Sequence, residues 1–203
     1  MKIAIIDSGV HPGHPHVGEI AGAVEITLAG EGRDAIDRLG HGTAVAGAIR
    51  EKVPDAELYA VKVFDRRLAA NIAVILRALA WCREHRMDLV NLSLGTENPA
   101  HRDSFVRILG DDLLVVSAAS HLPGTLPGVI GVAADPACPR DAFRYREGVF
   151  YASPYPRPIP GVPVAHNLQG ASFAVANMTG LIALALRNTR RSEILEALIA
   201  QSF

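Results

Sequence analysis

Three short segments contain residue types that could together perform nucleophilic catalysis. Asp7 ends the apolar run KIAIID, His41 lies in GHGTAVAGAI, and Ser172 lies in GASFAVANMTG. A serine hydroxyl is a weak nucleophile near neutral pH, and it needs an imidazole to accept its proton. The imidazole needs a carboxylate on its second nitrogen, which fixes the tautomer and stabilises the imidazolium. Asp7, His41 and Ser172 are therefore a candidate orienting acid, general base and nucleophile.

The order of these motifs resembles the catalytic core of the subtilisin family of serine peptidases. That family has its triad in the order Asp, His, Ser, and the segments IIDSGVHPGHP, GHGTAVAGAI and GASFAVANMTG match its pattern, with VKV and NLSLG between them. The similarity extends from Ile3 to about Leu186. It implies an acyl-enzyme mechanism on peptide or protein substrates without a cofactor.

Each member of the triad also has a structural interpretation. Ser172 could be a plain helix cap, Asp7 a polar residue that closes a strand, and His41 a satisfied core or capping histidine. The three motifs in one order favour the catalytic interpretation over these alternatives.

The chain between the motifs predicts the elements that must position them. Apolar runs alternate with segments of good helix formers, which indicates an α/β fold with a mostly parallel central sheet and helices on both faces. No internal repeat or linker interrupts the chain, so residues 1–203 are predicted to form one domain. We expect strands at 2–7, 57–63, 88–92, 112–118 and 128–134, and helices at 42–50, 68–86, 101–109, 172–187 and 192–201.

The oxyanion hole is the part of the site where the resemblance is weakest. A serine at a helix N-terminus can offer its own backbone N–H to the oxyanion, so Ser172 is one predicted donor. The second donor in the family is an Asn, and by alignment His121 takes its place. An imidazole N–H can also donate, although His121 could instead be a solvated loop residue. Ser120 and Asn98 are alternative donors.

Two segments resemble the strands with which the family pairs an extended peptide. They are Ser93-Leu94-Gly95 and Leu68-Ala69-Ala70. Backbone pairing would let the site accept many peptide sequences. The family usually has glycines at the second segment, and 68–70 could alternatively be the first turn of the following helix.

Other features depart from the family pattern. Ala171 and Ala176 replace a Thr and a Pro around the nucleophile, and the loop HLPGTLPG after the apolar strand is short. No pro-segment precedes Lys2, so we expect the chain either to fold unaided or to have lost an assisting segment.

Two loop sequences have a second interpretation. The run HPGHPH at 11–16 could bind zinc, although it matches the family's turn after the catalytic Asp; we expect no metal site there and carry over no calcium site. The segment SPYPRPIPGVP at 153–163 could be a polyproline ligand, but a rigid surface loop is the simpler interpretation.

Composition narrows the class of protein. The net charge of −1 and a pI near 6.7 give no electrostatic footprint for nucleic acid or an anionic membrane. No apolar run is long enough for a membrane helix, and no signal peptide precedes the first strand, which predicts a cytoplasmic protein. Cys82 and Cys138 are predicted to be free thiols.

The sequence therefore predicts a serine endopeptidase, with the maturation of a defined peptide as a candidate role. Two alternatives remain open. The fold could be catalytically silent and bind peptide, or the acyl-enzyme could be resolved by an amine, which would make the protein a peptide macrocyclase.

Overall fold

The structure is a computed structural model that describes residues 1–110 and 112–202. Its strands are β1 Lys2–Asp7, β2 Gly22–Ile26, β3 Glu31–Gly32, β4 Glu57–Lys62, β5 Leu89–Leu92, β6 Val115–Ala118, β7 Val129–Ala134, β8 Phe143–Arg146 and β9 Val149–Ala152. Its α-helices are α1 His41–Arg50, α2 Ile72–Glu84, α3 Arg102–Leu109, α4 Ala171–Ala185 and α5 Ile194–Gln201. Short 3₁₀ turns span Pro99–His101, Val164–His166 and Arg191–Glu193.

One nine-stranded sheet runs through the molecule in the order β3-β2-β4-β1-β5-β6-β7-β9-β8. All neighbouring strands are parallel except the two edge pairs, β2–β3 and β8–β9. The prediction of a mostly parallel α/β fold is confirmed. Strand β1 lies between β4 and β5, so Asp7 at its carboxyl end emerges near the middle of the sheet.

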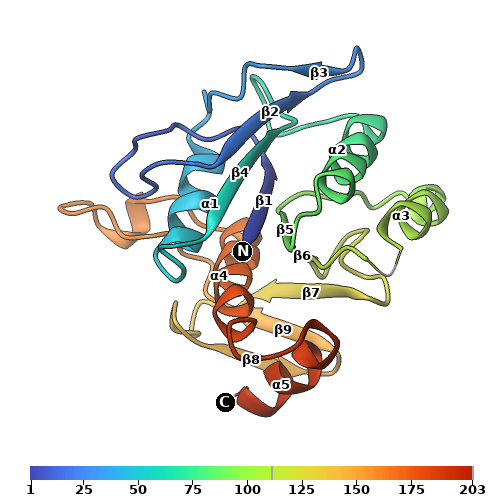
Figure 1. Ribbon diagram of the computed structural model, residues 1–203. Helices are drawn as coiled ribbons and strands as arrows, with labels where there is room; N and C mark the ends of the chain where they lie inside the picture. The colour runs from blue at the N-terminus through green and yellow to red at the C-terminus, as the bar shows by residue number, and fades with distance from the viewer. Residues whose placement is uncertain (111, 203) are drawn as a thin grey trace.

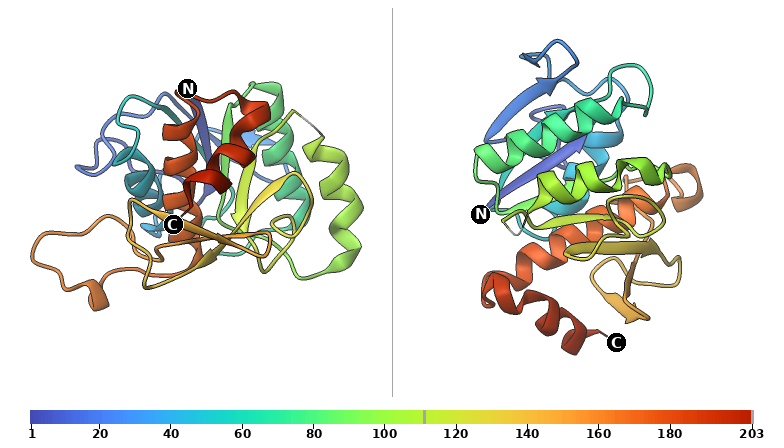
Figure 2. Two further views of the ribbon diagram at one scale, coloured as in Figure 1. Left: turned by 90° about the horizontal axis from the view of Figure 1, so that it is seen from below. Right: turned by 90° about the vertical axis from the view of Figure 1, so that its right-hand side faces the viewer.

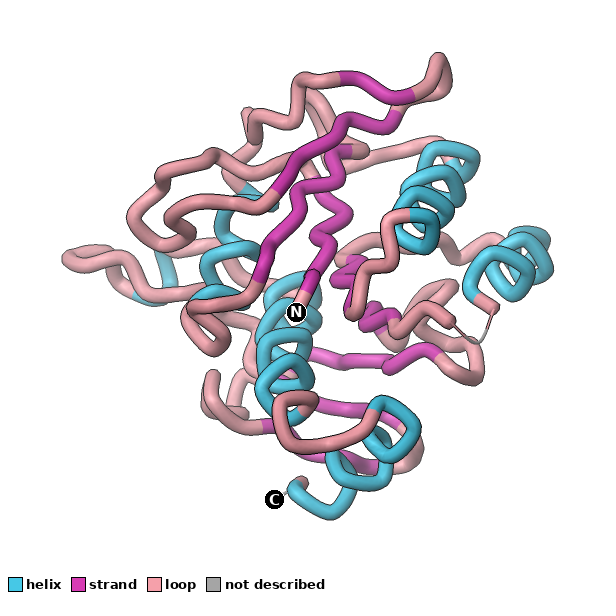
Figure 3. Tube along the Cα trace, viewed as in Figure 1, coloured by secondary structure: helices cyan, strands magenta, loops and turns pink. Residues whose placement is uncertain are grey.

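Helices cover both faces of the sheet, as Figures 1 and 3 show. Side chains alternate along a strand, so Ile3 and Ile5 of β1 join the core beneath α1, α4 and α5, whereas Ala4 and Ile6 join the core beneath α2 and α3. The apolar run Ile3–Ile6 of β1, which has no polar face, is explained by this two-sided burial.

Four strands were not predicted. β2 and β3 lie at one edge, where short strands carry little periodicity. β8 and β9 form a hairpin whose turn is Glu147-Gly148, both at positive φ, 50° and 85°. FRYREGVFYA alternates on both sides of this pair, but Glu-Gly is not among the dipeptides that usually mark a two-residue hairpin turn, so the hairpin signal was incomplete.

The predicted helix at 68–86 was wrong at its beginning. α2 starts at Ile72, because the Asn71 side chain accepts a hydrogen bond from the Ala73 N–H and caps the helix there. The interpretation of residues 68–70 as a helical turn is therefore also wrong. Among the described residues, no helix combines the length and apolar character that a membrane crossing requires.

Candidate active site

The structure brings Asp7 and His41 into direct contact. Asp7 is fully buried at the end of β1, and its Oδ1 lies 2.7 Å from Nδ1 of His41, the first residue of α1. Glycine at position 42 permits this approach, since a Cβ there would lie 2.1 Å from the Gly9 carbonyl oxygen. A charge-assisted hydrogen bond of this length fixes the imidazole with Nε2 directed away from the carboxylate.

A second buried carboxylate lies behind the pair. Asp37 accepts hydrogen bonds from the Ser8 hydroxyl at 2.8 Å and from the Thr43 N–H and hydroxyl at 2.8 and 2.6 Å. The Ser8 hydroxyl lies 3.2 Å from Asp7 Oδ1 and accepts from the Gly42 N–H at 3.0 Å. Asp37 thus caps α1 and is linked through Ser8 to the carboxylate that orients His41.

Sequence reasoning missed Asp37 and Ser8. A capping residue usually stands directly before the helix, whereas Gly40 occupies that position before α1 and Asp37 lies further upstream, so DRLGHG carried no standard capping signal.

The protonation of His41 reflects these neighbours. Burial alone lowers its pKa, but the hydrogen bond and charge of Asp7, together with the charge of Asp37, outweigh burial and raise the pKa of His41 above its ordinary value. The environment therefore stabilises the imidazolium that a general base becomes.

Ser172 lies at the start of α4, as predicted. Its Oγ donates to the Ser93 carbonyl at 3.3 Å, and with His41 it lines a hollow of about 310 Å³. A buried contact joins β5 to α4 beneath it, since Thr179 donates to Asn91 Oδ1 at 3.0 Å. The first turn of a helix leaves backbone N–H groups without intrahelical partners, which makes the Ser172 N–H available to an oxyanion.

His121 lines the same hollow as Ser172. Its ring is 38% exposed, its Nδ1 lies 2.6 Å from Ser120 Oγ, and its Nε2 lies 3.3 Å from a carboxylate oxygen of Glu97. Ser120 also lines the hollow, whereas Asn98 caps the following 3₁₀ turn by accepting from the Ala100 N–H. The structure thus brings His121 and Ser120 to the site and gives Asn98 another role.

The predicted substrate segments divide between two hollows. Ser93, Leu94 and Gly95 border the hollow of His41 and Ser172, and so does Leu68. Ala69 and Ala70 instead line a neighbouring hollow with Asn71 and Val74. Only one residue of the second predicted segment therefore reaches the catalytic hollow.

The structure also locates the other residues and segments in which the sequence departs from the family pattern or has a second interpretation. Ala171 opens α4 and lines the hollow, and Ala176 is buried in that helix. Within the part of the chain that the structure describes, no three histidine, cysteine, aspartate or glutamate side chains are grouped closely enough to hold a metal ion. The predicted surface loop at 153–163 belongs to the connection between β9 and α4; residues 153 and 154 are buried, and the part that follows Arg157 is exposed and projects from the body of the molecule in Figure 2.

The family follows from a comparison with known proteins. A sequence model of the subtilase family matches residues 1–134, which include Asp7 and His41. This chain belongs to the subtilase family. The match ends before Ser172, so the role of Ser172 as the nucleophile stays a prediction from its motif and its position.

Individual subtilases support the same conclusion. The chain is 33% identical over 132 residues to the minor extracellular protease Epr of Bacillus subtilis, covering 60% of this chain and 20% of that protein. It is 28% identical over 203 residues to subtilisin E of Bacillus subtilis, covering 89% of this chain and 52% of the relative. The match thus spans about half the length of subtilisin E and a smaller share of Epr.

A solved structure supports the fold. A cold-adapted subtilisin-like serine proteinase superposes with a TM-score of 0.76 and 17% identity over 98% of this chain and 81% of that one. At this identity the likeness shows that the two chains share a fold.

Proposed function

We propose that this subtilase is a serine endopeptidase that hydrolyses peptide bonds through Asp7, His41 and Ser172. The observation that carries the proposal is the buried 2.7 Å contact between Asp7 and His41, with the imidazole facing the hollow that Ser172 also lines. Ser172 would attack the scissile carbonyl while His41 accepts its proton, and His41 would then protonate the leaving amine. His41 would then accept a proton from a water molecule, which attacks the acyl-enzyme and releases Ser172.

The oxyanion would be held from two directions. The Ser172 N–H lies at the positive end of α4, where the helix dipole adds to the hydrogen bond. His121 would donate from Nε2, because a Ser120 hydroxyl that donates to Nδ1 leaves the ring proton on Nε2. A carboxylate oxygen of Glu97 lies 3.3 Å from this nitrogen and would be displaced by the oxyanion.

A second candidate function is peptide binding without catalysis. It is favoured by the Ser172 hydroxyl, which donates to the Ser93 carbonyl in the free protein. Catalytic hydrogen bonds often form only once substrate is bound, so this geometry does not decide between the two functions.

The test is labelling with a fluorophosphonate, which traps an activated serine, followed by mass spectrometry of a peptide library. We expect stoichiometric labelling at Ser172 and cleaved peptides. Matched controls are Ser172→Ala and Ser192→Ala, the second on an exposed surface. Unlabelled protein that binds peptides unchanged would support the silent fold, and cyclic products would support the macrocyclase.

The place of action is a further proposal. We propose that the protein acts in the cytoplasm and matures a defined peptide. The free thiols of Cys82 and Cys138 support this compartment, because the cytoplasm keeps cysteines reduced. One relative is named an extracellular protease. Fractionation of cells and medium, followed by detection with an antibody, distinguishes the two compartments.

A further inference from the structure

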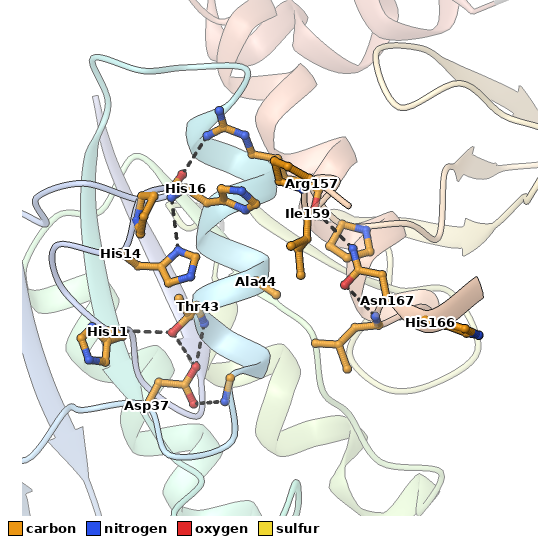
Figure 4. A pocket seen from close by; sticks show the side chains of 15 residues that line it. His11, His14, His16, Asp37, Thr43, Ala44, Arg157, Ile159, His166 and Asn167 are labelled. Carbon is orange, nitrogen blue, oxygen red and sulfur yellow. Dashed lines mark hydrogen bonds between the residues drawn. The ribbon is translucent and has the colours of Figure 1, made fainter. Parts of the chain in front are cut away.

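A second hollow lies beside the candidate active site. Its volume is about 820 Å³, within the range of ligand pockets. Figure 4 shows it between the histidine-rich turn at 11–16 and the proline-rich loop at 156–168, against the first turns of α1. We call it the histidine–proline pocket.

The loop that forms one wall is held in place. Asn177 on α4 donates from Nδ2 to the carbonyls of Ser153 and Tyr155, both at 2.9 Å, and so fixes the base of the loop. Further along, Arg157 donates to the His16 carbonyl at 3.3 Å, and Asn167 donates to the Arg157 carbonyl at 3.4 Å. The two walls are therefore joined by hydrogen bonds between their own residues.

The walls combine apolar surface with positive charge. Ile159 and Leu168 face the pocket while 44% and 45% exposed, which leaves apolar area for a ligand to cover. Arg157 is the permanent cation of the wall, and no carboxylate pairs with it in residues 1–110 and 112–202. Four histidines also line the pocket: His11, His14, His16 and His166.

No free carboxylate among the described lining residues balances the positive charge of Arg157. Asp37 is the only carboxylate among the described lining residues, and it is buried and occupied by the donors that cap α1. The pKa of His16 is lowered, first by burial and next by the positive charges of Arg157 and His14. Arg157 and His14 thus oppose a further positive charge here, and an anion would relieve that repulsion.

The pocket and the first hollow approach His41 and Ser172 through different residues. The pocket reaches Gly40, which precedes His41, and Leu168, which shortly precedes Ser172, and it shares no lining residue with the hollow that contains Ser93 and His121. A peptide whose acyl part paired with Ser93–Gly95 would pass His41 and Ser172 and then meet the histidine–proline pocket.

We propose that the histidine–proline pocket binds the leaving-group side of the peptide and selects an acidic side chain next to an apolar one. Arg157 would pair with the carboxylate, while Ile159 and Leu168 would cover the apolar neighbour. The inference rests on the proposed function, because it takes the catalytic hollow as the place of the acyl part.

The test compares peptides that differ only in Glu or Gln at one of the first four leaving-group positions, all with amidated C-termini. We expect kcat/KM to favour Glu about tenfold at one position, the usual size of a hydrogen bond to a charged group. Arg157→Gln should bring the ratio close to one, and Arg157→Glu should favour Lys instead. The matched control is Arg107→Gln on exposed α3, on the other side of the molecule in Figure 1, which should keep the parent ratio.

Three results would overturn the proposal: no Glu preference in the parent, a preference that survives both Arg157 variants, or a preference that requires a free C-terminal carboxylate. An inverted preference in Arg157→Glu cannot come from misfolding. Fluorophosphonate labelling and cleavage of an acyl p-nitroanilide, which has no leaving-group peptide, test the proposed function separately. If both fail in the parent, calorimetry still tests the pocket: the Glu peptide should bind about tenfold more tightly than the Gln peptide, and equal affinities would overturn the proposal.

Discussion

The two halves of the candidate catalytic machinery are built differently. The half that handles the proton, Asp7 and His41, is tied to Asp37 through the Ser8 hydroxyl, and Asp7 is fully buried. The half that handles the carbonyl, Ser172 and His121, is partly exposed, and its side chains are engaged by Ser93, Ser120 and Glu97. Under the proposed function, the first half would need no rearrangement for catalysis, whereas the second would exchange these partners for substrate.

The largest expected effect is on the nucleophile. Ser172→Ala should lower kcat by a factor on the order of 10⁶, the size seen when a catalytic serine of this kind is removed. The thermal unfolding midpoint should stay near that of the parent, because Ser172 makes only one long hydrogen bond through Oγ. Burst titration and calorimetry measure both. Undiminished turnover would place the nucleophile elsewhere.

Breaking the proton-handling half comes next. Asp7→Asn should lower kcat by about 10⁴, because an amide at this position favours the wrong imidazole tautomer while preserving shape. The matched control is Asp112→Asn, whose carboxylate is 78% exposed and pairs with Arg83 only at the surface; it should change kcat little. Equal losses in the two variants would mean that the Asp7 variant acts through general destabilisation.

Replacing the unusual oxyanion residue should have a smaller effect. His121→Ala should lower kcat by about 10²–10³ with little change in KM, since the oxyanion exists only near the transition state. His121→Asn should retain or raise activity, because it supplies the family's amide donor. If His121→Ala cleaves as fast as the parent, Ser120 is the next residue to replace.

The two halves also differed in how far the sequence predicted them. Asp7 and His41 come from tightly patterned segments, and their contact depends on a strand end and a helix start that the sequence marks clearly. The Asp37 link was missed because a loop residue reaches its partners only through the fold. The hydrogen bonds of His121 could not be predicted, since a solvated ring has several partners of similar energy.

The same reasoning applies to the fold. Fully buried runs such as β1 predicted the centre of the sheet, because no arrangement other than burial on both faces suits them. The edge strands β2 and β3 carried too little periodicity. Leu68–Ala70 was misread since helix propensity says nothing of the Asn71 cap that decides where α2 begins. The histidine–proline pocket arises from two loops distant in sequence, which no local pattern reveals.

Removing the charge of Asp37 tests its link to the triad. Asp37→Asn leaves one acceptor oxygen, so the amide loses either the Thr43 donors or those of Ser8, Leu39 and Gly40, and we expect a loss of about 1–3 kcal/mol in stability. Its negative charge helps to raise the pKa of His41, so its loss lowers that pKa. His41 then stays neutral, and able to accept a proton, at lower pH.

The measurement is the pH profile of kcat/KM. The acid limb should move to lower pH in Asp37→Asn, while the plateau falls a few-fold because the imidazolium of the transition state loses a stabilising charge. A structural role alone would lower the plateau without moving the limb. A matched control is Asp141→Asn, an exposed side chain, which should leave the limb in place.

The smallest effect concerns the two partners of His121, which should act in opposite directions. Glu97 competes with the oxyanion for the Nε2 proton, but its side chain is 85% exposed, and such pairs are worth about 0.2–1 kcal/mol. Glu97→Gln should therefore raise kcat by at most about fivefold, and the gain should shrink in high salt, which screens the pair in the parent.

Ser120→Ala removes the hydroxyl at 2.6 Å from Nδ1 and so frees the ring to hold its proton on the wrong nitrogen. In this variant kcat should fall a few-fold. In the His121→Asn background both effects should vanish, because an amide has no tautomer to fix. The measurement is the single-turnover acylation rate of Glu97→Gln and Ser120→Ala, each with His121 present and with His121→Asn. Effects that persist with His121→Asn would show that Glu97 and Ser120 act on the substrate directly.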